Sequence, residues 1–225
     1  MRTVIVSGGT GSLGVPVTKA LLDGGWRVIV PSRSSPEHGP LEANANLVLV
    51  QADPFDQESA DAVVASAGDE LAAVVNLVGG YSSGGRVHET PVDDFEAQFR
   101  LNLRPAYLLC HAAIPVMLAR GGGAIVCVST RAALRPFAGA AGYIASKAAI
   151  LAFVDVLNVE YARDGLRANA ILPSVIDTPA ARAEQPDADH SRWVTPEEVA
   201  RVIRFLVADD SSAVSGAHIP VYGRA

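Results

Sequence analysis

Short apolar runs rich in β-branched residues alternate along this chain with longer amphipathic stretches. Each short run is apolar at nearly every position, which is typical of strands buried on both faces of a sheet. Strands are expected at residues 3–6, 27–30, 47–51, 73–78, 124–129, 167–172 and 218–221. The longer stretches predict helices at 12–23, 57–67, 91–119, 142–163 and 195–208.

This alternation predicts a parallel sheet, because right-handed crossovers return each strand to the same direction and place helices on both faces. The expected fold is therefore a three-layer, doubly wound, Rossmann-like α/β sheet of about seven strands. A chain of 225 residues with 49% hydrophobic content fits one domain, residues 1–225. Segments 79–90 and 173–194 lack periodicity, and long loops in compact domains are often functional.

The charge balance limits the class of partner. The net charge is −6 and no basic cluster is present, which argues against nucleic acid and anionic membranes. We expect a small-molecule substrate, a second copy of the chain as partner, and a cytoplasmic location, since the opening apolar run is too short for a signal or a span. Cys110 and Cys127 lie in apolar runs and the histidines are scattered, so no metal is expected.

A glycine-rich segment, SGGTGSLG, joins the first strand to the first helix. Glycines there permit a tight turn and a close approach of backbone to phosphate, and the helix N-terminus supplies N–H donors. In this position the segment predicts a dinucleotide site rather than an ordinary turn. The residues expected to hold the cofactor are Gly8, Thr10, Gly11, Ser12, Leu13 and Gly14.

The end of the second strand indicates which dinucleotide is preferred. Folds of this kind that prefer NAD place an acid there for the ribose 2′-OH, but this chain has Ser32 and Arg33. An arginine can pair with the 2′-phosphate, so NADP(H) is favoured over NAD(H), although Arg33 as a plain surface charge is the alternative. Asp53 follows the third strand and could contact the adenine or cap a turn.

Tyr143 and Lys147 are four residues apart, so both project from one face of a helix. Lysine is rare in this chain, whose only other one is Lys19. A neighbouring ammonium stabilises phenolate, so we expect Lys147 to lower the pKa of Tyr143 and make it a proton donor or acceptor.

Polar groups at the ends of two other strands add to this centre. Ser129 and Thr130 lie at the carboxyl end of the fifth strand, where open α/β sheets bind ligands, and either hydroxyl could donate a hydrogen bond to the substrate oxygen. Asn76 ends the fourth strand. Asn102 lies inside an apolar helical face and must find partners there, so a structural contact and a proton-relay role are both open.

Taken together these motifs resemble the short-chain dehydrogenase/reductase family over nearly the whole chain. The pattern is a glycine-rich turn, Asn-x-x-Gly from Asn76 to Gly79, the helix Asn102, Thr130 thirteen residues before Tyr143, and Tyr-x-x-x-Lys. Thr130 stands where the family usually has Ser, and Ser174 where a Gly commonly follows Pro.

The resemblance implies an NAD(P)-dependent enzyme that interconverts a carbonyl and an alcohol. It implies that Tyr143 is the general acid, that Lys147 binds the nicotinamide ribose, and that Asn102 helps to pass protons to solvent. It also implies a homodimer or homotetramer formed through helices 91–119 and 142–163. Further cofactor contacts implied by the resemblance are Asn76, Val78, Gly79, Pro173, Ile176 and Thr178.

Three segments resemble one family member, dihydropteridine reductase, more narrowly: GGTGSLG, GGYSSGG and the stretch from Leu172 to Pro196. Dihydropteridine reduction is therefore an alternative activity, and a non-catalytic NADP-sensing regulator is a second one. The intact Tyr143 and Lys147 favour an enzyme, since a sensor has no need of them.

The segment 174–194 could close over a bound ligand, with a static surface loop as the alternative. Tyr81 and Trp193 would then be the large apolar surfaces around the substrate. Because Arg182 and Arg192 are the only cations expected nearby, the sequence predicts an uncharged cyclic or aromatic carbonyl, with a quinonoid dihydropterin as the specific alternative.

Overall fold

The computed structural model describes residues 1–33 and 41–224. It contains a seven-stranded sheet in the order β3-β2-β1-β4-β5-β6-β7, with every pair parallel. The strands are β1 (Thr3–Ser7), β2 (Arg27–Ser32), β3 (Leu47–Gln51), β4 (Leu71–Asn76), β5 (Gly123–Val128), β6 (Leu166–Pro173) and β7 (His218–Val221). The expected doubly wound, Rossmann-like α/β fold is confirmed.

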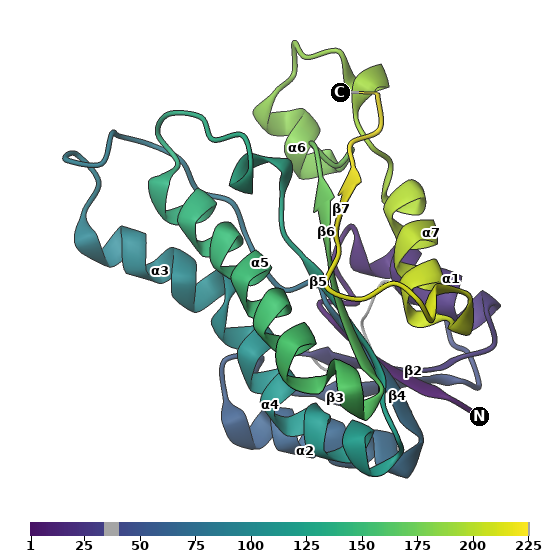
Figure 1. Cartoon of the computed structure of the whole chain (residues 1–225). Coiled ribbons are helices and arrows are strands. Elements are labelled where there is room, and N and C mark those ends of the chain that lie inside the picture. The colour runs from purple at the N-terminus through teal and green to yellow at the C-terminus, as the bar shows by residue number, and fades with distance from the viewer. Residues whose placement is uncertain (34–40, 225) are drawn as a thin grey trace.

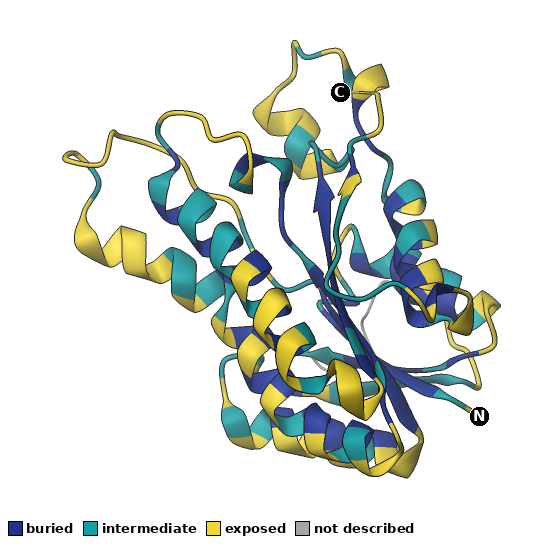
Figure 2. Ribbon diagram, viewed as in Figure 1, coloured by how far each residue is buried: buried dark blue, intermediate teal, exposed yellow. Residues whose placement is uncertain are grey.

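Helices cover both faces of this sheet, as Figure 1 shows. They are α1 (Gly14–Asp23), α2 (Gln57–Ala67), α3 (Val92–Asn102), α4 (Arg104–Ala119), α5 (Ala141–Tyr161), α6 (Pro179–Glu184) and α7 (Pro196–Val207). The core has two halves: α2, α4 and α5 pack on one face of the sheet, and α1 and α7 pack on the other. Strands β1, β4 and β5 are buried on both faces, which is why their sequences are almost continuously apolar (Figure 2).

Most expected elements differ from the observed ones by one or two residues at an end, and three differences bear on the candidate site. The helix expected over 91–119 is interrupted at Leu103, because Pro105 has no N–H to continue the hydrogen-bond ladder from α3 into α4. The fourth strand lies at Leu71–Asn76 rather than 73–78, so Asn76 ends it. The segment 173–194, expected to be irregular, contains α6 and a short 3₁₀ turn, His190–Arg192.

Two helical stretches, Val92–Ala119 and Ala141–Asp164, are long and apolar enough by composition to cross a membrane. Core helices satisfy the same criterion, so the finding is weak evidence for a span. In the structure α4 and α5 bury apolar side chains such as Leu109, Ile114, Ile150 and Val154 against the sheet. Their hydropathy is therefore explained in part by core packing.

The parallel sheet brings the ends of distant segments to one edge. Gly8, Arg33, Asp53, Gly79 and Thr130 each lie at or just after the carboxyl end of a strand. Since all the strands run in the same direction, these residues share the carboxyl edge of the sheet, where open α/β folds bind ligands. The fold thus assembles one candidate site from five separate parts of the sequence.

Candidate active site

The glycine-rich turn after β1 is tightly packed. Gly8 has φ +82°, and a Cβ there would lie 3.0 Å from the backbone N of Val78. A Cβ on Gly14 would lie 2.0 Å from the carbonyl oxygen of Gly8, so only glycine permits helix α1 to begin this close to the turn. The sequence motif missed Gly9, where a Cβ would meet the methyl groups of Val30 at 2.8 and 2.9 Å.

The first turn of α1 is open to a ligand. Leu13, the N-cap residue, makes no side-chain hydrogen bond to the helix, and the first turn contains no acid. Helix N-terminal N–H groups without a side-chain cap attract anions. Thr10 is half-buried and Gly11 and Ser12 are exposed, so this side of the turn is accessible. The turn from Gly8 to Gly14 and the first turn of α1 therefore form a glycine cradle that fits the pyrophosphate of a dinucleotide.

The other residues expected to hold a dinucleotide lie along the same edge. Ser32 ends β2 and Arg33 is exposed directly after it. The carboxylate of Asp53 accepts a hydrogen bond from the backbone N–H of Phe55 at 3.0 Å, so it does cap a turn. Pro173 ends β6, Ile176 pairs with Val194, and Thr178 caps α6.

Lys147 is enclosed by protein, with only 7% of its surface exposed. Its Nζ donates a hydrogen bond to the carbonyl of Val128 at 3.0 Å. Burial lowers the pKa of Lys147 from 10.5 to about 8, and the nearby thiol of Cys127 acts in the opposite direction. Because the charge of Lys147 is poorly solvated, its pKa lies close to physiological pH.

Gly79 brings the β4 loop against this ammonium. A Cβ on Gly79 would lie 2.9 Å from Nζ of Lys147 and 2.7 Å from Oδ1 of Asn102. Asn102 is 1% exposed, accepts a hydrogen bond from Gly80 N and donates one to Ser146 Oγ at 3.0 Å. The helix asparagine is thus held in a network that reaches α5.

Tyr143 is half-buried at the start of α5, and Ser146 Oγ donates a hydrogen bond to its backbone carbonyl at 2.8 Å. Burial raises the pKa of Tyr143 and Tyr81 raises it further, whereas the side chain of Thr130 lowers it. The prediction that Lys147 sets a lowered pKa is therefore wrong for this structure. The physical reason is that Lys147 directs its ammonium at the Val128 carbonyl, and the loss of water around the phenol dominates.

The two adjacent hydroxyls have different environments. Ser129 Oγ donates to the backbone carbonyl of Lys147 at 2.7 Å, which anchors strand β5 to helix α5. Thr130 Oγ1 accepts a hydrogen bond from Ala132 N at 3.3 Å. The Thr130 side chain also lies near the phenol of Tyr143, whose pKa it lowers. The structure thus brings Thr130 and Tyr143 together, while Ser129 already has a structural partner.

Tyr81 lies beside Tyr143, and the two rings meet edge to face with 5.0 Å between centroids. Tyr143 also lines a pocket of about 110 Å³ with residues of the 79–90 loop and α3, including Ser82, Glu89 and Gln98. Trp193 instead lines a separate pocket of about 470 Å³ with His190, whose ring centroid is 4.4 Å away. The structure does not bring Tyr81 and Trp193 into one pocket.

Asn76 has a structural environment that the sequence did not reveal. Its Nδ2 donates to Cys110 Sγ at 3.4 Å and to Cys127 Sγ at 3.5 Å, and both thiols are free and buried. Asn76 and the two thiols lie close to Lys147, whose positive charge is among the effects that lower the pKa of Cys127. Within residues 1–33 and 41–224 no group of His, Cys, Asp or Glu side chains is placed to hold a metal ion.

A parallel, doubly wound sheet with a glycine cradle after β1 and a tyrosine–lysine pair at its carboxyl edge defines a class of dinucleotide-binding α/β proteins. The family model described as enoyl-(acyl carrier protein) reductase matches residues 8–223. This match, and the relatives below, show that the chain belongs to the short-chain dehydrogenase/reductase family.

Two of the relatives that match this chain are named as dehydrogenases. The 2-(R)-hydroxypropyl-CoM dehydrogenase of Xanthobacter autotrophicus is 32% identical, and the match covers 99% of this chain and 97% of that relative's length. The cyclohexanol dehydrogenase of an Acinetobacter species is 32% identical, covering 76% of this chain and 70% of its own. The protein is accordingly an oxidoreductase of the class that acts on CH–OH and C=O groups, and its family uses a nicotinamide cofactor.

Solved structures agree with this assignment. One described as a short chain dehydrogenase/reductase family protein has a TM-score of 0.90 and 30% identity, covering 99% of this chain and 96% of that chain. The structure of ElxO with NADP bound has a TM-score of 0.88 and 23% identity, and the match covers 99% of this chain and 97% of that chain. At this identity the likeness shows the fold alone. These matches show the family and not the narrower resemblance to dihydropteridine reductase.

Proposed function

We propose that this protein is an NADP(H)-dependent oxidoreductase that interconverts a carbonyl and an alcohol with Tyr143 as the general acid and base. One observation carries the proposal: the Thr130 side chain and the Tyr143 phenol lie together at the carboxyl end of β5, next to the enclosed ammonium of Lys147. No other place in residues 1–33 and 41–224 combines these groups at the edge where the fold binds ligands.

The raised pKa of Tyr143 suits the reductive direction. At neutral pH the phenol is protonated and can give its proton to a carbonyl oxygen as negative charge develops there. The Thr130 hydroxyl can donate a hydrogen bond to the same oxygen and also stabilises the phenolate that remains. A bound nicotinamide would supply the hydride.

Lys147 has two roles in this proposal. Below its pKa of about 8 it is an ammonium, which stabilises negative charge at the end of β5. Its Nζ also lies next to Gly79, and so against the Asn102 network that continues to Ser146 and the Tyr143 carbonyl. Asn102 therefore acts as a positioning residue that holds helices α3 and α5 at the correct separation.

The preference for NADP(H) rests on Ser32 and Arg33. Neither carries the negative charge that would repel a 2′-phosphate, and Arg33 is exposed immediately after β2. A guanidinium makes charge-assisted, bidentate hydrogen bonds to phosphate. The glycine cradle at Gly8 and Gly14 would hold the pyrophosphate in either cofactor.

We further propose that the protein forms a homodimer or homotetramer through α4 and α5. Tyr107 on α4 and Val156 and Val159 on α5 are large apolar side chains that are 52%, 49% and 83% exposed. Large apolar side chains exposed on two helices favour association with a second copy. Sedimentation of the purified protein tests this, and a monomer at micromolar concentration would contradict it.

A substrate panel tests the proposed activity. Aldehydes, ketones and quinones are each incubated with NADPH and with NADH, and loss of nicotinamide absorbance is followed. We expect turnover of at least one class, faster with NADPH, that disappears in Tyr143→Phe. Tight cofactor binding with no turnover of any carbonyl, and none of the reverse reaction with alcohols, would refute the proposal.

A further inference from the structure

One arginine beside the candidate active site is unlike the others in the chain. The half-buried arginines are Arg2, Arg27, Arg131 and Arg167. All of these except Arg131 donate side-chain hydrogen bonds to protein acceptors. Arg131 donates no side-chain hydrogen bond to, and forms no ion pair with, any residue in 1–33 or 41–224, although it is partly withdrawn from water.

Arg131 immediately follows Thr130 at the carboxyl end of β5. Its guanidinium carbon lies 5.0 Å from the ring centroid of Tyr222, which follows β7. The backbone carbonyl of Tyr222 accepts a hydrogen bond from Ser174 Oγ at 2.8 Å, which ties the aromatic ring to the end of β6. Arg131 is therefore held one residue, or ~3.8 Å along the backbone, from the Thr130 of the proposed reacting centre.

The contact with Tyr222 determines which part of the guanidinium can be used. Cation–π attraction holds the guanidinium over the aromatic ring but leaves its N–H donors without a hydrogen-bond acceptor. Those donors lie in the plane, in a fork that matches the two oxygens of a carboxylate. A partly desolvated arginine with such a fork strongly prefers an anion to water.

We infer that Arg131, held by Tyr222, binds a carboxylate on the carbonyl substrate, so that the enzyme selects oxo acids over their uncharged analogues. This inference rests on the proposed carbonyl–alcohol activity and names its substrate class. It replaces the sequence-based expectation of an uncharged substrate, which considered only Arg182 and Arg192. Arg182 is already engaged in two hydrogen bonds to Asp177, and the exposed Arg192 donates from Nε to the backbone carbonyl of Arg224 at 3.4 Å.

Matched acid and ester substrates test this inference. Benzoylformate and 4-formylbenzoate are each compared with their methyl esters in wild type and Arg131→Gln. In wild type we expect kcat/KM to be about tenfold or more higher for at least one acid than for its ester, or ~1.4 kcal/mol. In Arg131→Gln the ratio should fall to about one through a higher KM for the acid, with ester turnover within about twofold of wild type.

Two further variants distinguish recognition from loop structure. Arg135→Gln removes the same charge four residues away at an exposed position and should leave the acid-to-ester ratio unchanged. Tyr222→Leu removes the aromatic face and should reduce the ratio by part of the Arg131→Gln effect. A ratio that stays the same in Arg131→Gln, or an equal loss on acid and ester, would overturn the inference.

A binding measurement separates this inference from the proposed function. Calorimetric titration with benzoate, in the presence of NADP, should give binding to wild type that Arg131→Gln weakens about tenfold or more. That result supports the anion site even if none of the carbonyls is turned over. Turnover of both esters by wild type, without a preference for either acid and without benzoate binding, refutes the anion site and leaves the proposed function standing.

Discussion

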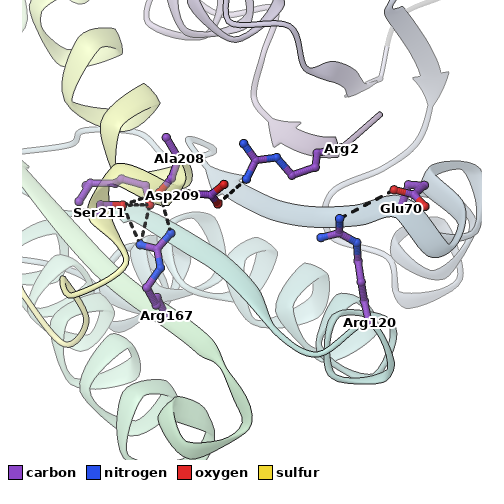
Figure 3. Close-up of polar contacts among 8 residues, drawn as sticks. Arg2, Glu70, Arg120, Arg167, Ala208, Asp209 and Ser211 are labelled. Carbon is purple, nitrogen blue, oxygen red and sulfur yellow. Dashed lines mark hydrogen bonds and ion pairs between the residues drawn. The ribbon is translucent and has the colours of Figure 1, made fainter.

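Two regions of the molecule withdraw a cation from water, wholly at Lys147 and partly at Arg167, and the protein solvates the two charges very differently. On β6, Arg167 donates to the carbonyls of Leu206, Ala208 and Val214 and to the Ser211 hydroxyl, at 2.9 to 3.5 Å. Figure 3 shows the contacts with Ala208 and Ser211. On α5, Lys147 donates to one carbonyl, that of Val128. Burial lowers the pKa of both groups, and it lowers that of Lys147 to about 8.

The difference separates a structural charge from a chemical one. The acceptors around Arg167 include carbonyls at the end of α7, which have no partner within the helix, so the guanidinium closes that helix and stays charged. Lys147 lacks such a shell, and its charge is available to the groups at the carboxyl edge of the sheet. We infer that the poorly solvated cation is the one used in the reaction.

The strongest test of this division is to remove the proton that Tyr143 would transfer. Tyr143→Phe should lower kcat about 1,000-fold, because general acid catalysis typically contributes a factor of this order. Steady-state kinetics with the best substrate of the panel measures the change. Cofactor affinity and melting temperature should remain near wild type, and a kcat within tenfold of wild type would place the acid elsewhere.

The second test compares the neighbouring hydroxyls. Thr130→Val should lower kcat about 100-fold, since it removes a donor to the oxygen on which charge develops. Ser129→Ala should affect folding more than rate, because its hydroxyl bonds the Lys147 carbonyl at 2.7 Å. Kinetics and thermal unfolding of both variants are compared, and the opposite ranking of the two rate losses would assign the donor role to Ser129.

The third test replaces each of these two cations, Arg167 and Lys147, by methionine. Arg167→Met should lower the free energy of unfolding by about 3 kcal/mol, because it removes the charged donor of several hydrogen bonds, and should leave kcat unchanged. Lys147→Met should remove activity but keep or raise stability, by up to about 3 kcal/mol. Urea unfolding measures both, and a large loss of stability in Lys147→Met would contradict the comparison.

The fourth test follows the ionisation of Lys147. Its ammonium is present below about pH 8 and lost above it, so the rate of carbonyl reduction should be flat to that pH and then fall about tenfold per pH unit. Cofactor must be saturating throughout. An unchanged rate up to pH 10 would show that the charge of Lys147 is not needed.

Stability should change in the opposite sense. Between about pH 8 and 10.5 an unfolded Lys147 binds a proton that the folded protein has released, so this residue favours folding more as pH rises. The free energy of unfolding of wild type should therefore increase relative to that of Lys147→Met across this window. A difference that is independent of pH would mean that the pKa of Lys147 is not shifted.

The smallest expected effect lies away from both cations, at the end of β2. Arg33→Ala should reduce the preference for NADPH over NADH by about tenfold, the value of one charge-assisted hydrogen bond. Fluorescence titration with each cofactor gives the two dissociation constants. Affinity for NADH should not change, and a similar weakening of both cofactors would show that Arg33 does not recognise the 2′-phosphate.

Much of the fold was predictable because its signals are local. Each buried strand is an apolar run bounded by turns. Helix α7 carries its own start signal, because Thr195 and Glu198 form a capping box and Pro196 occupies the first turn. The break between α3 and α4 was also encoded in Pro105, but the apolar periodicity on both sides of it concealed the interruption.

The candidate site residues were likewise predicted from the sequence alone. The glycine spacing after the first strand, the four-residue interval from Tyr143 to Lys147 and the position of Thr130 follow from motifs within a single βα unit or helix. Spacing within one element determines which side chains share a face, so no tertiary information is needed for that step.

Only the tertiary structure decided how those side chains behave. The pKa of Tyr143 depends on how much water the packed loops exclude, and the engagement of Ser129 by the Lys147 carbonyl depends on how β5 meets α5. The contact of Arg131 with Tyr222 joins residues that are far apart in the chain and meet only because the ends of β5 and β7 share one edge of the sheet. Solvation and long-range contacts are properties of the packed molecule, and for that reason no local pattern in the sequence contains them.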